Sequence, residues 1–408
     1  MSEQDNDNLE DLDDVISPDD VVEIIELDDN GVVVDAMDDV VIIDDDDDDN
    51  GDVDMGASGG EDIKDMADIV FDKHTDAVFC VSIDPKSCDL VVTGGQDDKA
   101  YVWKLSTGEV LFECIGHKDS VTCTGFSHDG VYVATADISG LVIVWKIDSK
   151  EVVFTFECSD AEWMKWHPAS HVLFLGTVDG DVWMWKIPSG DCKTLQSHGR
   201  TASCGVVLGD GKRMCVGYDD GSVKLWDLKS GTIQHSVTGN SAHKSTVLSV
   251  DVNPLNNLII SGSTDVTAKI INGATAKVLA TFDCSSPGVE ENSVETVGFS
   301  PTHAFAATGT VAGVLSIWDT NTQICRHRCP HNAGIVSLQW DKLSPMVYTS
   351  CLDGAIRLWN ARSGELTSTW TGHRDSILGF DISKDGNWLV TASDDNTARV
   401  FSLSSPDR

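Results

Sequence analysis

The side chains best suited to chemistry in this chain are carboxylates in short loops between β-rich runs. Glu162 and Glu295 occupy the same position in two copies of a repeated pattern, at the start of an apolar run. In other copies that position holds Phe79, Thr122, Leu248, Val336 and Leu378. Carboxylates placed there favour charge-assisted hydrogen bonds to Arg or Lys of a bound protein. The adjacent Trp163 would offer an aromatic platform to the same cation.

Further acids lie in the same loops and in the tight turns near them. Binding residues concentrate in loops that are held by a rigid scaffold. The alternative is that these acids are merely solvated, because charges at a rim often contribute little to affinity. The predicted partner-binding residues are Asp119, Asp160, Glu162, Trp163, Asp219, Glu291, Glu295, Asp375 and Asp394.

Catalysis and metal binding find little support in the sequence. It contains no nucleophile elbow, Walker loop, HExxH motif or EF-hand loop. Most of the 12 His fall in a repeated loop position or in turns, as His128 and His167 do, which favours structural roles. The run Asp44–Asp49 lacks the interleaved Gly and distal Glu of a calcium loop. We expect no enzymatic activity, no cofactor and no metal site.

A repeat of about forty residues defines the elements that position these loops. Each copy contains short apolar runs and ends its third run on a marker aromatic residue. The spacings between successive markers are 42, 40, 41, 45, 47, 41 and 42 residues. Asp179-Gly180, Asp220-Gly221 and Asp353-Gly354 mark two-residue hairpins between the second and third runs. The eight markers are Trp103, Trp145, Trp185, Trp226, Ile271, Trp318, Trp359 and Phe401.

These features predict an all-β fold in which each copy is a four-stranded antiparallel meander. Such a unit cannot bury both faces alone, so the copies should stack radially. The pattern resembles the WD40 repeat family, with Gly116-His117, Gly372-His373, Trp226-Asp227 and Trp318-Asp319 matching its signature. The resemblance implies an eight-bladed WD40 β-propeller.

In that family, a loop His, a strand Ser/Thr, a turn Asp and the marker Trp form a hydrogen-bonded chain inside each blade. The resemblance implies two complete sets here. They are His74, Thr93, Asp97 and Trp103 in the first copy, and His331, Thr349, Asp353 and Trp359 in the seventh.

Other copies depart from the family pattern. Ser139 and Ala312 stand where Asp is expected, Ile271 and Phe401 replace the Trp, and the third and sixth copies lack the loop His. Because these two copies depend more on packing than on buried polar bonds, we expect their blades to open most easily.

The ends of the repeat region predict how the ring closes. Too few residues follow Phe401 for a fourth strand in the last copy, whereas the apolar run Ala67–Phe71 precedes the first copy with no blade of its own. We therefore assign residues 67–408 to the propeller and expect residues 67–72 to complete its last blade. Residues 1–66 form a separate acidic segment.

Charge is divided unevenly between these two parts. The 408 residues carry 67 acidic and 28 basic side chains, a net charge of −39. Residues 1–66 hold 27 Asp and Glu and one Lys, which predicts a disordered acidic tail. Short aliphatic islands within it, such as Val40–Ile43, could add to the sheet edge of a partner, although incidental aliphatics are the simpler interpretation.

The overall composition also excludes several classes of protein. A chain this acidic lacks the electrostatic attraction that direct nucleic-acid binding requires. No apolar run is long enough to span a bilayer, and the first residues lack the features of a signal peptide. The 12 Cys are scattered without CxxC spacing, which is typical of reduced thiols in the cytosol or nucleus.

Several longer segments resemble one particular family of WD40-repeat proteins. Leu111–Asp129, Glu162–Pro168, Gly190–Thr194 and Pro406–Arg408 resemble the angio-associated migratory cell protein family, eight-repeat WD proteins with acidic amino termini. That family is linked to cell migration and endothelial tube formation. It is also similar to fungal ribosome-assembly propellers, which hold the basic amino-terminal segment of a large-subunit ribosomal protein on an acidic face. A basic heparin-binding stretch found in some members is missing from this sequence.

The resemblance and the acidic loops together give two functional hypotheses. The first is a monomeric, non-enzymatic chaperone, cytoplasmic or also nuclear, that binds a basic segment of a ribosomal protein. The second is a signalling scaffold in migration pathways, with a peripheral pool at the plasma membrane. Neither requires a transmembrane segment or direct contact with nucleic acid.

Overall fold

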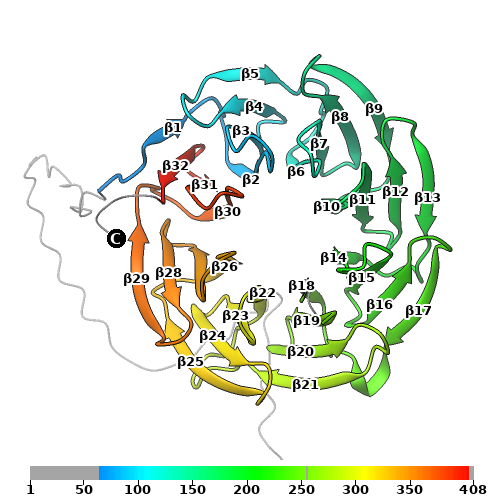
Figure 1. Ribbon diagram of the computed structural model, residues 1–408, viewed down its shortest axis with the longest axis vertical. Helices are drawn as coiled ribbons and strands as arrows, with labels where there is room; N and C mark the ends of the chain where they lie inside the picture. Colours follow the sequence, from blue (N-terminus) through cyan, green and yellow to red (C-terminus); the bar gives the residue numbers. More distant parts are fainter. Residues whose placement is uncertain (1–63, 254–255, 404–408) are drawn as a thin grey trace, which may run out of the picture. The chain divides into compact units, whose positions relative to one another are not determined.

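The computed structural model describes residues 64–253 and 256–403. The predictions for the acidic tail, its aliphatic islands and the Asp44–Asp49 run lie outside the described residues, apart from the last three residues of the tail. The described part of the chain forms 32 strands and one short 3-10 helix, η1 (Gly239–Ser241). The strands form eight four-stranded antiparallel sheets arranged in a ring, as predicted (Figure 1).

The strands of each blade follow one another from the centre of the ring outward. The innermost strands are β2 (Val78–Ile83), β6 (Val121–Phe126), β10 (Ala161–Trp166), β14 (Ala202–Val207), β18 (Val247–Val252), β22 (Val294–Phe299), β26 (Ile335–Trp340) and β30 (Ile377–Ile382). The second strands are β3 (Leu90–Gly95), β7 (Tyr132–Asp137), β11 (Val172–Thr177), β15 (Arg213–Tyr218), β19 (Leu258–Ser263), β23 (Phe305–Thr310), β27 (Met346–Cys351) and β31 (Trp388–Ser393).

The two outer layers contain the marker aromatics and the exposed edges. The third strands are β4 (Ala100–Lys104), β8 (Leu141–Lys146), β12 (Val182–Lys186), β16 (Val223–Asp227), β20 (Thr267–Asn272), β24 (Val314–Asp319), β28 (Ile356–Asn360) and β32 (Ala398–Ser402). The outer strands are β5 (Val110–Glu113), β9 (Glu151–Glu157), β13 (Asp191–Leu195), β17 (Thr232–Val237), β21 (Val278–Asp283), β25 (Ile324–Pro330), β29 (Glu365–Trp370) and β1 (Ile69–Phe71). We number the blades 1 to 8 from β2.

The core consists of the layers between neighbouring blades. Second and third strands are covered on both faces, so most of their residues are buried, whereas the outer strands are largely exposed. One layer joins Val142 and Val144 of blade 2 to Leu173 and Trp185 of blade 3. Stacking the copies therefore buries the faces that a single copy leaves open.

The first and last strands of the propeller pair with each other. In β1, Ile69 pairs with Val400 and Phe71 with Ala398 of β32. Phe71 is buried and stacks on Trp103 of blade 1, with ring centroids 4.6 Å apart. The short strand before the first copy thus supplies the fourth strand of blade 8 and contacts blade 1.

The polar chain predicted for blade 1 is present. His74 Nδ1 lies 2.9 Å from Asp97 Oδ1, and His74 Nε2 lies 3.0 Å from the Thr93 hydroxyl. Trp103 Nε1 donates to the same hydroxyl at 3.3 Å. Four side chains from separate parts of the blade are therefore linked in its interior.

In blade 7 the hydrogen-bonded chain of side chains differs from the predicted one. His331 Nε2 lies 3.0 Å from the Thr349 hydroxyl and accepts from Trp359 Nε1 at 3.1 Å. Its Nδ1, however, donates to the Cys329 carbonyl oxygen at 3.1 Å. Asp353 instead binds the guanidinium of Arg357, four residues later, because that charged partner competes for the carboxylate.

Blade 2 contains the polar chain that the sequence alignment left incomplete. His117 Nδ1 lies 3.1 Å from Asp137 Oδ2, two residues before the Ser139 that fills the expected position. The Ser139 hydroxyl donates to the other oxygen of Asp137 at 2.7 Å. In blade 6, without a loop His, Trp318 Nε1 still donates to the Thr308 hydroxyl at 3.0 Å.

Candidate partner-binding mouth

A repeated backbone bond places the predicted binding loops at one end of the ring. In blade 3 the Val178 amide donates to the Asp160 carbonyl oxygen at 3.0 Å, and in blade 8 the Asp394 amide donates to Ser376 at 3.0 Å. Equivalent bonds occur in all eight blades. They join the loop that leads into each inner strand (the leading loop) to the turn after the second strand. We call this end of the propeller the mouth.

A β-bulge aims one residue per blade at the mouth. In every blade, the pairing between inner and second strands shifts by one residue at the second position of the inner strand. Bulges of this kind redirect a side chain. All eight bulged residues are at least partly exposed. They are Phe79, Thr122, Glu162, Ser203, Leu248, Glu295, Val336 and Leu378, with Ser203 the member that the sequence alignment missed.

Glu162 lies in a cluster of carboxylates. Partial burial raises the pKa of Glu162, and the negative charges of Asp160 and Asp219 raise it further. Asp219 Oδ1 is buried and has no hydrogen-bond partner among the described residues. Because like charges are held together here, a cation from a bound protein would relieve their repulsion.

A second group of acids lies in blade 8. Partial burial raises the pKa of Asp394, and Asp375 and Asp395 add to the effect by like-charge repulsion. Asp395 Oδ2 already forms a hydrogen bond with His373 Nδ1 at 2.9 Å, and Asp375 Oδ1 accepts from the Ser376 amide at 2.8 Å. Asp394 and Asp375 retain oxygens that can accept from a guest.

The remaining predicted acids stand apart from these two groups. Glu295 accepts a hydrogen bond from Ser293 Oγ, so part of its capacity is used within its own loop. Glu291 and Asp119 are exposed in the leading loops of blades 6 and 2. Glu295 of blade 6 does not lie next to Glu162 of blade 3, because blades 4 and 5 stand between them (Figure 1).

Trp163 is not a platform at the mouth. Its side chain is 7% exposed, and its Nε1 donates to the Ala202 carbonyl oxygen of blade 4 at 2.8 Å. A Cβ on Gly176 or Gly205 would lie within 2.5 Å of the indole. The expectation of a cation–π contact here was wrong, because the indole packs between blades 3 and 4, whereas the bulge turns Glu162 toward the mouth.

The mouth also has features that the sequence interpretation did not assign to a site. Val336, Leu378 and Phe79 occupy the bulges of three consecutive blades, 7, 8 and 1, and form an apolar arc. The leading loops also carry Lys118 and Arg374, both exposed. Acids and apolar side chains therefore share the mouth: the blade 3–4 acids lie away from the apolar arc, whereas the Asp375–Asp394 pair lies on blade 8, which belongs to it.

Family models match most of the repeats. The WD domain, G-beta repeat model matches residues 68–104, 108–146, 232–272, 323–360 and 364–402. The model of the anaphase-promoting complex subunit 4 WD40 domain matches residues 164–243. Human angio-associated migratory cell protein is 49% identical over 363 residues, which cover 86% of this chain and 84% of the human protein.

The chain belongs to the angio-associated migratory cell protein family. This member is also 24% identical to the ribosome assembly protein SQT1 of Saccharomyces cerevisiae, over 82% of this chain and 86% of that protein. Among solved structures, it is similar to Chaetomium thermophilum Sqt1 bound to the N-terminus of ribosomal protein L10. The TM-score is 0.76 at 23% identity, covering 83% of this chain and all of that one.

The structural similarity of this family member to Sqt1 establishes the shared propeller fold. Among the described residues, no helix has both the length and the apolar character needed to cross a membrane. The partner that the mouth binds depends on the side chains of this chain that line it.

Proposed function

We propose that this propeller is a non-enzymatic chaperone that holds a basic segment of a newly made ribosomal protein at its mouth. The observation that carries the proposal is the cluster of Glu162, Asp160 and Asp219, in which partial burial and then the neighbouring negative charges raise the pKa of Glu162. A Lys or Arg side chain that enters this cluster would remove the repulsion and form charge-assisted hydrogen bonds.

The similarity to SQT1 and to the Sqt1 complex with the N-terminus of ribosomal protein L10 supports this choice of guest. The amino-terminal segment of the corresponding ribosomal protein is the first candidate. We propose that the complex contains one copy of each chain and forms in the cytoplasm. Shielding the basic segment would keep it from RNA until assembly.

The arrangement of the mouth suggests how a segment would be oriented. Basic side chains of the guest would contact the blade 3–4 acids and the Asp375–Asp394 pair, while an apolar residue would pack on Val336, Leu378 and Phe79. The 27 acids in residues 1–66 would raise the rate of encounter with a cationic guest through long-range attraction.

Co-purification from cells tests the identity of the guest. The full chain and its Glu162→Lys/Glu295→Lys variant would be isolated, and bound proteins identified by mass spectrometry. The matched control is Glu151→Lys/Glu365→Lys, which makes the same change in charge at exposed residues of outer strands. We expect a basic ribosomal protein with the wild type and the control but not with the mouth variant. Recovery of the same protein with all three chains would contradict the proposal.

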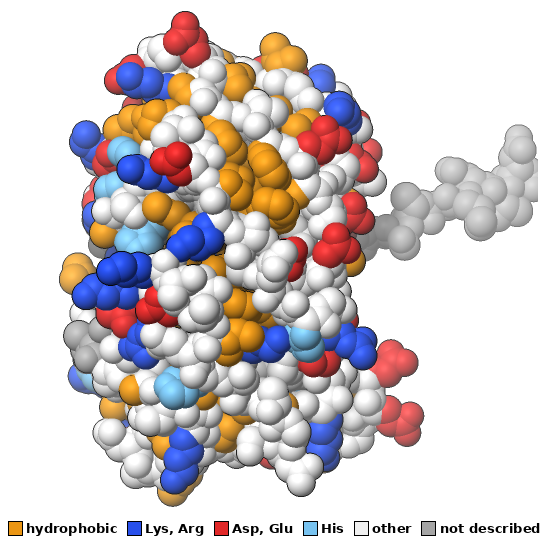
Figure 2. Space-filling model, turned by 90° about the vertical axis from the view of Figure 1, so that its right-hand side faces the viewer, with side chains coloured by type: hydrophobic (Ala, Val, Ile, Leu, Met, Phe, Trp, Pro, Cys, Tyr) orange, Lys and Arg blue, Asp and Glu red, His pale blue; other side chains and the backbone are white. Residues whose placement is uncertain are grey.

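A signalling scaffold for migration pathways is the second candidate. The name of the human relative and the exposed aliphatic side chains of the outer strands favour it, for example Val152 at 51% and Ile324 at 64% exposure. Figure 2 shows hydrophobic side chains gathered on the side of the propeller formed by β9, β13 and β17. Apolar docking there would depend weakly on salt, whereas capture of a basic segment would weaken steeply as salt increases.

A further inference from the structure

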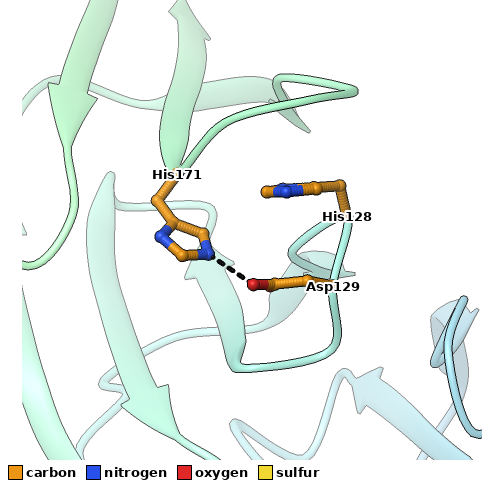
Figure 3. Close-up of side chains that lie close together, drawn as sticks. All are labelled: His128, Asp129 and His171. Carbon is orange, nitrogen blue, oxygen red and sulfur yellow. Dashed lines mark hydrogen bonds and ion pairs between the residues drawn. The ribbon is translucent and has the colours of Figure 1, made fainter.

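Three potential metal ligands meet at the end of the ring opposite the mouth. His128 and Asp129 lie in the turn between β6 and β7 of blade 2, and His171 lies in the turn between β10 and β11 of blade 3 (Figure 3). One ligand atom from each residue lies within 4.8 Å of the others. Residues from two blades thus face one small space.

Asp129 is fixed in an orientation suited to a ligand. Its Oδ1 accepts from the Ser127 hydroxyl at 2.9 Å and from the Val131 amide at 3.3 Å, and its Oδ2 faces His171 Nε2 at 2.9 Å. Contacts from its own turn and from His171 therefore hold the carboxylate at the space between the two blades.

One ring nitrogen of His128 is buried. Its Nδ1 is inaccessible to solvent and has no hydrogen bond among the described residues, and its ring centroid lies 5.2 Å from that of His171. The nearby His167 is a useful contrast. Its Nε2 lies 2.9 Å from the Gly211 carbonyl oxygen and its Nδ1 accepts from the Ala169 amide at 3.1 Å. A structural histidine in this region thus has both nitrogens bonded, and His128 does not.

We propose that His128, Asp129 and His171 form a zinc site that links blades 2 and 3. Two imidazoles and one carboxylate, with water as a fourth ligand, are a ligand set that Zn²⁺ commonly accepts. In a tetrahedral site with bonds of about 2.0–2.1 Å, ligand atoms lie roughly 3.3 Å apart. His171 and Asp129 need to separate by only a few tenths of an ångström from their present 2.9 Å. His171 would bind the metal as the neutral ring with its proton on Nδ1, which leaves the Nε2 lone pair free.

The site has a structural role in this account. Blade 3 lacks the loop His and its polar chain, yet it carries Glu162 at the mouth. A metal bound between the turns of blades 2 and 3 would hold blade 3 to its neighbour. This inference concerns the opposite end of the ring and does not depend on the proposed function.

Calorimetric titration with Zn²⁺ tests the proposal. The full chain, freed of metal, would be titrated in millimolar Mg²⁺, which occupies sites made of carboxylates alone. Titration with Co²⁺, followed by its absorption spectrum, reports the ligand geometry. The variants are His171→Ala and Asp129→Asn, and the matched control is His235→Ala, an exposed histidine on β17.

We expect one Zn²⁺ bound per wild-type or His235→Ala chain, with at least a tenfold loss of affinity in the other two variants. Unchanged thermal unfolding of Asp129→Asn in the absence of metal would show that its loss of affinity is not a loss of folding. The proposal is overturned if the wild type binds no Zn²⁺ under these conditions, or if both variants bind it as the wild type does.

Discussion

Trp163 Nε1 on blade 3 donates a hydrogen bond to the Ala202 carbonyl oxygen on blade 4, across 2.8 Å. The indole fills the space above Gly176 and Gly205, and it is buried among residues of both blades. Its neighbour Glu162 is exposed at the mouth. One bulge therefore sets both the packing between two blades and the direction of the acid that we assign to binding.

Replacing Trp163 tests the packing role. Trp163→Ala should lower the free energy of unfolding by about 3–5 kcal/mol, because it leaves a cavity between two blades. Trp163→Phe keeps most of the ring and loses the N–H donor, so its cost should be about 1–3 kcal/mol. Chemical denaturation gives both values. An alanine variant as stable as the wild type would show that the indole does not hold these blades together.

Truncation tests the closure of the ring. A chain without residues 1–60 keeps Asp65, whose carboxylate pairs with Arg399, and keeps β1 on β32. Its thermal midpoint should match that of the full chain. Removing residues 1–72 deletes β1 and exposes the face of Trp103 on which Phe71 stacks, so the midpoint should fall sharply. Equal midpoints for the two truncations would contradict closure by this strand.

Hydrogen exchange tests how stability differs between blades. Blades 3 and 6 lack the buried His that links strands in blades 1, 2, 5 and 8. Backbone amides of β11 and β23 should therefore exchange faster than those of β3, measured by mass spectrometry of peptic fragments. Faster exchange in β3 would contradict this ordering.

The buried His331 predicts a loss of stability in mild acid. Burial lowers its pKa to about 4, from 6.5, and its Nε2 must stay unprotonated to accept from Trp359. Since the folded-state pKa lies below the unfolded one, stability is full above about pH 6.5 and falls as the pH drops toward 4. Between pH 7.5 and 5 the loss should be up to about 2 kcal/mol.

Denaturant titrations at the two pH values measure this loss. His331→Gln cannot take up the proton, so its stability should fall less over the same interval. Identical pH dependence of the variant and the wild type would show that protonation of His331 does not destabilise the fold.

The sequence predicted the eight blades because the marker spacing, the Asp-Gly turns and the apolar runs agree with one another. The predictions from sequence were wrong where a residue's role depended on the direction of its side chain. Glu162 and Trp163 are adjacent, but a β-bulge at Glu162 turns its carboxylate to the mouth while Trp163 packs between blades, and the pattern of residue types does not reveal the bulge. In blade 2 the carboxylate comes from Asp137, two residues before the expected position, and in blade 7 Arg357 competes for Asp353; a position in a repeat encodes neither.

The candidate site was predictable only in part. The alignment of the copies identified the position that the structure shows to be bulged in every blade, including Glu162 and Glu295. It could not show that Asp219 of blade 4 lies near Glu162 of blade 3, because that proximity arises from the stacking of the two blades.

Binding of a basic ribosomal-protein peptide to the full chain tests the central claim most directly. Fluorescence anisotropy at low and high salt would compare the wild type with Glu162→Lys/Glu295→Lys and with the control Glu151→Lys/Glu365→Lys. We predict that the mouth variant loses affinity roughly 100-fold, that the control binds like the wild type, and that added salt weakens wild-type binding steeply. Equal affinity of the mouth variant and the wild type would contradict the claim that the mouth captures the peptide.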